Sequence, residues 1–333
     1  MINTIYTKSL EITLFFTKLY KLHYYMTLCN KSGDCMGTSI QKIKIGVFKC
    51  GNVGTAPIFE LLLDELAQRK DIIVRTVTTG AKMGLEDVED AFPKILEFTP
   101  DLLVIISPNP SVAGPTFARE MAIQNSINTV VMSDAVAKRM IPDLEKQGVG
   151  YIITLGDPLI GARREFLDSV EMALFNSNIL KILAVAGVLR LIHQEIDRVI
   201  AVLKENLAVR LPRLLIDTET IRDNSDFANP YAKAKAMAAY HIASKIPEIN
   251  TKACFMEKDS EKFIPLVACA HEMAQIAARL AEEAREIEKY SDTLERKPHS
   301  KKGEPLTKTK LMESPKFDDV LYKKWLKTLP NNG

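Results

Sequence analysis

Short runs of β-branched and apolar residues alternate with helical patterns between Lys42 and Gly156, and this alternation restricts the fold more than any other feature of the chain. Each run has the length of one strand, and each gap is long enough for a helix. A parallel sheet with helices on both faces requires this order. We therefore predict an α/β domain over residues 41–160, with five strands at 43–48, 72–77, 102–107, 129–133 and 150–155.

Helical patterns fill the gaps between these runs. Apolar residues recur at helical spacing near 57–69, 86–98, 115–124 and 135–147. Pro93 lies inside the second pattern, and because proline lacks the backbone N–H that a helix interior needs, we expect the helix to kink or restart there.

The first run leads into a glycine turn that contains Gly51, Asn52, Gly54 and Thr55 and is followed by Pro57. The glycines permit a tight turn, and the proline can begin a helix without losing a hydrogen bond. The first amides of that helix are expected to attract an anion. The turn lacks the Walker lysine and serine and has the spacing G-x-x-G, so it matches neither a P-loop nor the dinucleotide fingerprint. Packing of helix against strand alone would also explain the glycines.

Polar residues follow the ends of the other predicted strands. Lys82, Asn109, Asp134 and Asp157 all lie just beyond a strand. Because the carboxyl ends of parallel strands form the ligand-binding crevice of an open α/β sheet, we expect these loops to converge on one site. The alternative is that such residues merely form turns, which explains the glycines better than it explains Lys82 and Asp134.

After Gly161 the pattern becomes helical, and we predict a helix-bundle domain over residues 161–290. Asp168 and Glu171 have the spacing of a capping box, Gly187 interrupts the following helix, and Asn229 caps another. Apolar residues on more than one face between Ile179 and Leu191 indicate burial against a second subunit as well. Residues 291–333 are charged and proline-containing, and are expected to form a small appendage.

Three charged residues and one histidine in this half are further candidates. Arg163 and Arg164, with Glu165 beside them, suit the carboxylate or phosphate groups of a substrate through forked hydrogen bonds. An inter-domain salt bridge is an equally good interpretation of the arginines. His271 is the best placed of five dispersed histidines, although a histidine near an apolar helix face is more often a core residue.

The composition excludes several classes of function. The 333 residues are 47% hydrophobic and 26% charged with a formal net charge of +2, which indicates a globular protein that does not bind nucleic acid. The five cysteines form no C-x-x-C pair and no metal-ligand spacing, so we expect reduced thiols in the cytoplasm and no metal. Residues 1–40 contain no membrane span and are expected to form an extension outside the main fold, with Met26 or Met36 as alternative starts.

Three segments go beyond these general patterns. They are Lys-Cys-Gly-Asn-Val-Gly-Thr (49–55), Pro-Asn-Pro-Ser-Val-Ala-Gly-Pro (108–115) and Gly-Ala-Arg-Arg-Glu-Phe-Leu-Asp (161–168). In this order and spacing they closely resemble the coenzyme F420-dependent methylenetetrahydromethanopterin dehydrogenases of methanogenic archaea. Asn-Pro-Tyr-Ala-Lys-Ala-Lys-Ala-Met-Ala-Ala (229–239) and Ala-His-Glu-Met (270–273) strengthen the resemblance, which covers about residues 43–312. Val53 and Ala56 stand where the family typically has leucine and serine.

The resemblance implies a Rossmann-like sheet with a helical domain, and reversible hydride transfer between coenzyme F420 and the methenyl and methylene forms of tetrahydromethanopterin, a one-carbon step of methanogenesis from CO2. It implies that F420 is a dissociable cosubstrate, that no prosthetic group is bound, and that the protein is a homo-oligomer, a hexamer built as a trimer of dimers. Because such cosubstrates carry the reactivity, the protein contributes orientation and electrostatics, and no catalytic triad is expected.

The resulting site assignment is a set of hypotheses. Gly51, Asn52, Gly54, Thr55, Lys82 and Asn109 are expected to bind F420. Asp134 and Asp157 are expected to stabilise the cationic methenyl carbon or to bond to the pterin ring. Arg163, Arg164, Glu165 and His271 are expected to contact the substrate.

Two other functions remain open on the sequence. An NAD(P)-dependent pterin dehydrogenase would share the fold and the reaction type, although the third fingerprint glycine and an acidic residue after the second strand are missing. A non-catalytic pterin- or nucleotide-binding module would use the same crevice.

Overall fold

The computed structural model describes residues 42–57, 68–158, 163, 165–166 and 168–327. A six-stranded parallel sheet forms its centre, with the strand order β2-β1-β3-β4-β5-β6. The strands are β1 (Ile43–Lys49), β2 (Ile72–Thr78), β3 (Leu102–Ile106), β4 (Asn128–Asp134), β5 (Gly150–Thr154) and β6 (Arg213–Ile216). The predicted α/β class and parallel sheet are confirmed, and the expectation of five strands is one strand short.

The sixth strand comes from the half of the chain that we expected to be wholly helical. β6 pairs in parallel with β5, with Tyr151 opposite Arg213 and Thr154 opposite Ile216. Its four residues are too short for a periodic pattern to emerge from the helical segments around them. The described residues form one compact unit in which the sheet draws on both predicted domains.

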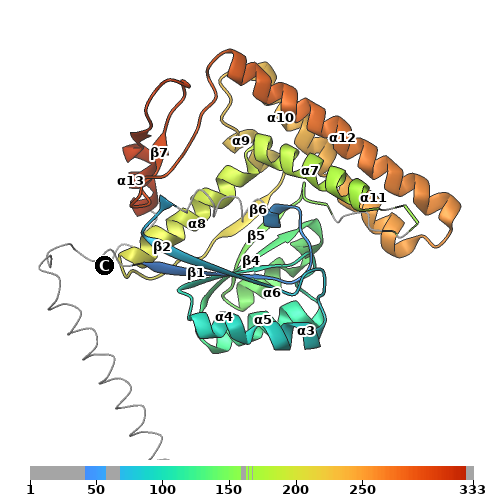
Figure 1. The fold of residues 1–333 in the computed structure, drawn as a ribbon, viewed down its shortest axis with the longest axis horizontal. Coiled ribbons are helices and arrows are strands. Elements are labelled where there is room, and N and C mark those ends of the chain that lie inside the picture. The colour runs from blue at the N-terminus through green and yellow to red at the C-terminus, as the bar shows by residue number, and fades with distance from the viewer. Residues whose placement is uncertain (1–41, 58–67, 159–162, 164, 167, 328–333) are drawn as a thin grey trace, which may run out of the picture. The chain divides into compact units, whose positions relative to one another are not determined.

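One face of the sheet is covered by short helices. They are α3 (Leu85–Ala91), α4 (Pro93–Phe98), α5 (Ala113–Gln124), the 3-10 helix η2 (Ala135–Met140) and α6 (Ile141–Lys146) (Figure 1). Pro93 begins α4, so the restart predicted at this proline is confirmed. Phe48 and Phe92 meet edge to face under α3 and α4, with ring centroids 5.0 Å apart. The predicted helix at 57–69 falls mostly outside the described residues.

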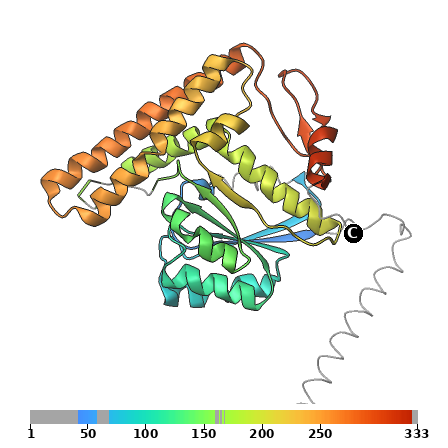
Figure 2. The same ribbon diagram turned by 180° about the vertical axis from the view of Figure 1, so that it is seen from behind.

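The helices of the second half of the chain lie on the other side of the sheet. They are α7 (Ser169–Ala186), α8 (Val188–Lys204), α9 (Thr218–Asn224), α10 (Pro230–Ala243), α11 (Ile246–Thr251) and α12 (Ser260–Tyr290), with the π-helix η3 (Lys252–Met256) between the last two (Figure 2). Asp168 caps α7 by accepting the Glu171 N–H at 2.8 Å, and Gly187 ends that helix in the left-handed conformation. Asn229 caps α10. The predicted caps and the break at Gly187 are confirmed.

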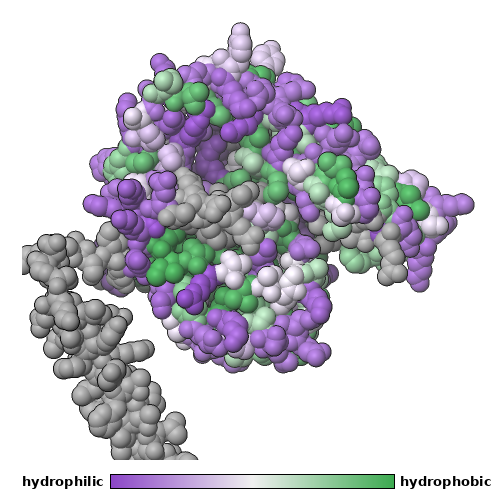
Figure 3. Space-filling view, viewed as in Figure 1, coloured by the Kyte–Doolittle hydropathy of each residue, from purple (hydrophilic) through white to green (hydrophobic). Residues whose placement is uncertain are grey.

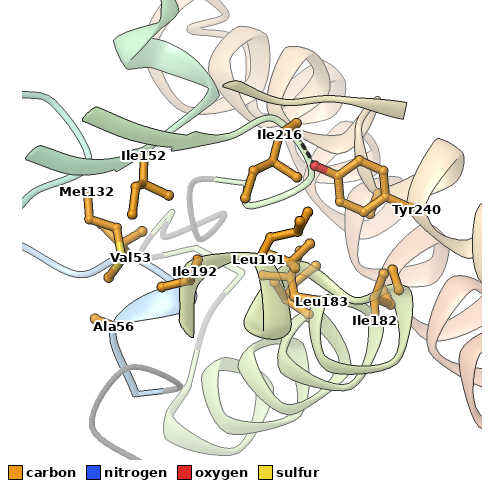
Figure 4. Packing of buried hydrophobic residues seen from close by; sticks show 14 of the residues in the cluster. Val53, Ala56, Met132, Ile152, Ile182, Leu183, Leu191, Ile192, Ile216 and Tyr240 are labelled. Carbon is orange, nitrogen blue, oxygen red and sulfur yellow. Dashed lines mark hydrogen bonds between the residues drawn. The ribbon is translucent and has the colours of Figure 1, made fainter. Parts of the chain in front are cut away.

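The largest core cluster joins the sheet to these helices (Figure 4). Met132 and Ile152 point from the strands toward α8, where Leu191 and Ile192 are buried. Tyr240 of α10 donates a hydrogen bond from its hydroxyl to the Ile216 carbonyl at 2.7 Å, so the bundle is fastened to β6.

The C-terminal segment forms a small appendage, as predicted. It contains the two-stranded pair β7 (Leu306–Thr307) and β8 (Lys316–Phe317) and the helix α13 (Asp319–Lys327). A buried charge cluster attaches it to the rest of the fold. Asp197 of α8 accepts from Arg69 at 2.7 Å and lies 2.7 Å from the Nε2 atom of His299, while Arg69 also pairs with the buried Asp71.

Candidate active site

The glycine turn lies where the loops after three neighbouring strands meet. Gly51 has φ of +93°, and its N–H donates to the Gly80 carbonyl at 3.0 Å. A side-chain carbon at Gly51 would lie 2.7 Å from the Cδ atom of Pro108 and 2.9 Å from the sulfur of Met83. Only glycine satisfies both the backbone angle and the close packing. The loops after β1, β2 and β3 therefore meet at Gly51, as predicted.

Two backbone amides of this turn are already hydrogen-bonded to an acidic side chain of the protein. Gly54 and Thr55 donate their N–H groups to the two carboxylate oxygens of Asp157, at 3.0 and 2.6 Å. Asp157 is fully buried, and a side-chain carbon at Gly54 would lie 2.5 Å from its Oδ1 atom. The expectation that these two amides are free for a ligand is therefore wrong, because an acid that follows β5 occupies them. The contribution of Gly54 and Thr55 to cofactor binding stays a prediction.

Asp134 lies at the end of β4 and is 1% exposed. Its Oδ1 atom accepts the Val136 N–H at 3.0 Å, which caps η2. Burial, reinforced by the negative charge of Asp157, raises the pKa of Asp134 well above its usual value. Burial also raises the pKa of Asp157 to about 6, although hydrogen bonds from Thr55 and Gly54 oppose the shift. The two predicted catalytic acids thus lie close enough to influence each other electrostatically.

One oxygen of Asp134 is uncommitted. Its Oδ2 atom is buried and has no hydrogen-bond partner among the described residues, and the same holds for the hydroxyl of Thr154, the residue opposite Asp134 in the sheet register. Leaving buried polar atoms unpaired costs about 1–3 kcal/mol each, so such atoms are candidates for ligand contact. Thr154 was not among the predicted site residues, although its place at the end of β5 was a signal.

The remaining predicted cofactor residues surround the turn. Asn52 is exposed, and Lys82, in the loop after β2, forms an exposed ion pair with Asp87 at 3.0 Å. Asn109 accepts the N–H and hydroxyl of Ser111 on its side-chain oxygen, which fixes the loop after β3. These three residues and Gly51 therefore lie in the loops that follow β1, β2 and β3.

Arg163 has contacts of another kind. Its guanidinium donates to the backbone carbonyls of Ala253, at 3.2 Å, and Glu257, and its centre lies 4.0 Å from the ring of Phe263. These contacts fasten the loop before α7 to η3, so the structure gives Arg163 a structural role, and its contact with substrate stays a prediction. Glu165 is exposed. Arg164 lies outside the described residues.

His271 is packed between aromatic rings. Its ring centroid lies 4.4 Å from that of Phe175 and 4.9 Å from that of Phe166, and its Nδ1 atom is 3.6 Å from a carboxylate oxygen of Glu171. Burial lowers its pKa, although Glu171 opposes the shift. This environment is that of a core histidine, the alternative considered above, and its contact with substrate stays a prediction.

The described residues contain no group of three or more His, Cys, Asp or Glu side chains placed to hold a metal ion. One helix of this part of the chain, α7, is long and apolar enough to cross a membrane by length and composition. A core helix passes the same test.

Known proteins match this architecture along most of the chain. The family model for methylene-5,6,7,8-tetrahydromethanopterin dehydrogenase matches residues 43–316. The F420-dependent methylenetetrahydromethanopterin dehydrogenases of Methanocaldococcus jannaschii and Methanothermobacter thermautotrophicus are 49% and 50% identical, and each alignment covers 82% of this chain and 99% of the relative.

A solved structure agrees with the sequence comparisons. It is an F420-dependent methylene-tetrahydromethanopterin dehydrogenase in complex with methylene-tetrahydromethanopterin and coenzyme F420, and it matches with a TM-score of 0.80 and 43% identity over 83% of this chain and 100% of its own. The family predicted from the three sequence segments is confirmed, and the chain belongs to the methylene-5,6,7,8-tetrahydromethanopterin dehydrogenase family.

Proposed function

We propose that this protein catalyses reversible hydride transfer between coenzyme F420 and the methenyl and methylene forms of tetrahydromethanopterin. The observation that carries the proposal is the match to a relative solved with both compounds, which covers the whole of that relative at 43% identity. The match includes the sheet, the crevice loops and the helical half. The place in methanogenesis from CO2 follows from this reaction.

Direct hydride transfer requires that the two cosubstrates are correctly oriented, and it requires no protein nucleophile. F420 supplies the hydride donor or acceptor when bound, and the protein holds the two cosubstrates in contact and excludes water. The loops after β1, β2 and β3, with Gly51, Asn52, Lys82 and Asn109, would hold F420. The close packing of Gly51 against Pro108 and Met83 leaves no side chain in the way.

Asp134 would interact with the pterin. Its uncommitted Oδ2 atom is available to a hydrogen-bond donor, and burial together with the charge of Asp157 raises its pKa. Arrival of the cationic methenyl form favours the ionised carboxylate, which stabilises that charge. Asp157 would act behind it, through the Gly54 and Thr55 amides.

The test is anaerobic spectrophotometry of the purified protein with oxidised F420 and methylenetetrahydromethanopterin, with NAD and NADP in parallel. We expect loss of deazaflavin absorbance and no reduction of NAD or NADP. Turnover with NAD(P) alone would favour the nicotinamide-dependent alternative, and no turnover by folded protein would favour a binding module. Asp134→Ala should lower the hydride-transfer rate several-fold or more, whereas Asp143→Ala, an exposed acid on α6, should not.

We also propose that the protein is a homo-oligomer. Only 33% of the 18-residue α7 is buried although its mean hydropathy is 1.3, and Val170 and Leu174 are 61% and 54% exposed. Apolar side chains reach the surface over the right-hand part of the helical half, where α7 lies (Figure 3). A second copy of the chain would cover this face, and a trimer of dimers is the assembly that the family resemblance implies.

Light scattering tests the assembly. We expect a mass of several chains that falls in Val170→Glu and Leu174→Glu but not in Val320→Glu, which changes an exposed valine on α13. A wild-type mass of one chain would contradict the proposal. The cytoplasmic location predicted from the sequence stays a prediction.

A further inference from the structure

An open cleft of about 520 Å³ lies between η2, which follows β4, and the segment formed by α11 and η3. Ala135 and Val136 line it on one side, and Pro247 and Met256 on the other. Because Ala135 directly follows Asp134, the cleft adjoins the acid that we assign to the pterin. Its apolar lining would accept the carbon skeleton of a ligand that extends out of the crevice.

Each side of this cleft carries one cation. Arg139 projects from η2 and Lys252 from η3, and both are exposed. Arg139 reaches the Ser111 hydroxyl at 3.5 Å, and in the described part of the chain neither cation forms an ion pair. Lys82, by contrast, is paired with Asp87. A cation that forms no ion pair within the protein is available to an anionic ligand group.

The segment that carries Lys252 is held in a defined conformation. Residues 252–256 form a π-helix in which the Glu257 N–H donates to the Lys252 carbonyl at 2.9 Å. Arg163 donates to the carbonyls of Ala253 and Glu257, directly after Lys252 and at the end of this turn. π-Helical turns occur frequently at functional sites, and this one is pre-organised by Arg163, whose guanidinium also packs over the ring of Phe263 at 4.0 Å.

We propose that Arg139 and Lys252 bind the anionic tail of the pterin cosubstrate, a chain that ends in carboxylate or phosphate groups. The proposal rests on the proposed function. It assigns the anionic tail to Arg139 and Lys252 instead of to Arg163, whose guanidinium is bonded to the carbonyls of Ala253 and Glu257. The position after β4 distinguishes the two cosubstrates. The F420 residues follow β1, β2 and β3, so a pterin that meets F420 at the reacting carbons extends its tail toward β4 and η2.

Glu248 adjusts the charge of the same cleft. It also lines the cleft, four residues before Lys252 on the same stretch of helix, so the lining has two cations and one anion. A carboxylate here repels an anionic tail, which predicts opposite effects for substitutions of the acid and of the cations.

Steady-state kinetics separates the two cosubstrates. Arg139→Ala and Lys252→Ala are each expected to raise KM for methylenetetrahydromethanopterin about fivefold or more, the scale of one partly screened ionic hydrogen bond. KM for F420 and kcat should change less than twofold, and Glu248→Gln should lower the pterin KM. The control is Lys138→Ala, which removes the exposed neighbour of Arg139 on η2 that does not line the cleft.

Several outcomes would overturn the proposal. A rise in KM for F420 instead of the pterin would assign the cleft to the other cosubstrate, and a Lys138→Ala effect equal to that of Arg139→Ala would reduce it to general surface charge. Calorimetric titration of methylenetetrahydromethanopterin without acceptor gives an independent reading. Tail binding predicts weaker affinity for the Arg139→Ala/Lys252→Ala double variant and a smaller loss of affinity with added KCl than in the wild type. Absence of F420 turnover would refute the proposed function, whereas unchanged pterin affinity in the double variant would refute only this assignment.

Discussion

The Asp157 carboxylate accepts the backbone N–H of Thr55 at 2.6 Å, across 102 residues of sequence. The Gly54 N–H donates to the other carboxylate oxygen of Asp157. Together the two hydrogen bonds connect the loop after β5 to the turn after β1 and hold that turn in its conformation without a ligand. The arrangement resembles phosphate binding by a glycine turn, with a side chain in place of the ligand.

Asp157→Asn should loosen the turn. The amide keeps one acceptor oxygen but places an NH2 group opposite a backbone N–H, and loss of a hydrogen bond to a buried charged group costs about 1.5–3 kcal/mol. We expect a lower melting temperature and a several-fold higher KM for F420. Asp168→Asn is the matched control, because asparagine also caps helices well and Asp168 lies at the exposed start of α7. An unchanged KM for F420 in folded Asp157→Asn would separate the turn from cofactor binding.

The same acid should give stability a pH dependence of unusual sign. The pKa of Asp157 is raised to about 6 in the folded protein, so the folded state binds this proton more tightly than the unfolded chain does. Its stabilising contribution is full below the unfolded pKa of about 4 and is lost as pH rises through about 6, with a total of about 2–3 kcal/mol.

Urea unfolding between pH 4.5 and 7.5 measures this effect. The difference in unfolding free energy between wild type and Asp157→Asn should shift against the wild type as pH rises, whereas Asp168→Asn should run parallel to the wild type. Staying above pH 4.5 avoids the low-pH range in which acids with depressed pKa values, such as Asp197, lose their own contributions. Parallel curves for all three proteins would exclude a raised pKa at Asp157.

The buried charge cluster at the C-terminal appendage should contribute strongly to stability. Although burial opposes it, the hydrogen bond and charge of His299 together with the charge of Arg69 hold the pKa of Asp197 far below its usual value. Asp197→Ala leaves Arg69 with a missing partner in a buried site, and breaking a buried ion pair costs about 3–5 kcal/mol. Asp226→Ala, which removes the partly exposed partner of Arg190 and Lys297, should cost less than about 1 kcal/mol. Equal shifts in the urea midpoint would contradict the assignment.

Tyr240→Phe tests the link between the bundle and the sheet. The hydroxyl accepts the Gly156 N–H at 3.1 Å and donates to the Ile216 carbonyl at 2.7 Å. Its loss leaves the buried Gly156 N–H unpaired, whereas the Ile216 carbonyl still accepts the Leu155 N–H at 3.0 Å. We expect a loss of about 1–3 kcal/mol in thermal or urea unfolding. Tyr231→Phe makes the same change on the exposed face of α10 and should be nearly neutral. A neutral Tyr240→Phe would mean that water replaces the hydroxyl.

Features encoded by neighbouring residues could be predicted from the sequence. The buried runs located five strands, Pro93 located the restart of a helix, and Asp168 and Gly187 located the ends of α7. Each depends on local periodicity or on the chemistry of one residue, which a sequence displays directly.

Features that depend on distant partners could not be predicted in the same way. The occupant of the Gly54 and Thr55 amides comes from a strand end more than 100 residues away. Arg163 has the right chemistry for a substrate anion, but its side chain is bonded to the carbonyls of η3. The signal that could have located β6 was the apolar run at 214–216, directly before the polar cap Asp217.

The origin of β6 also limits how the molecule can open. β6 pairs with β5 along its whole length, and α10 is bonded to it through Tyr240, so the helical half cannot swing away from the sheet as a rigid body without tearing a ladder of backbone hydrogen bonds. We therefore do not expect this fold to close as two lobes about a hinge, a movement that is common in enzymes that bind two ligands. Instead, we expect the two cosubstrates to bind without a swing of the helical half onto the sheet.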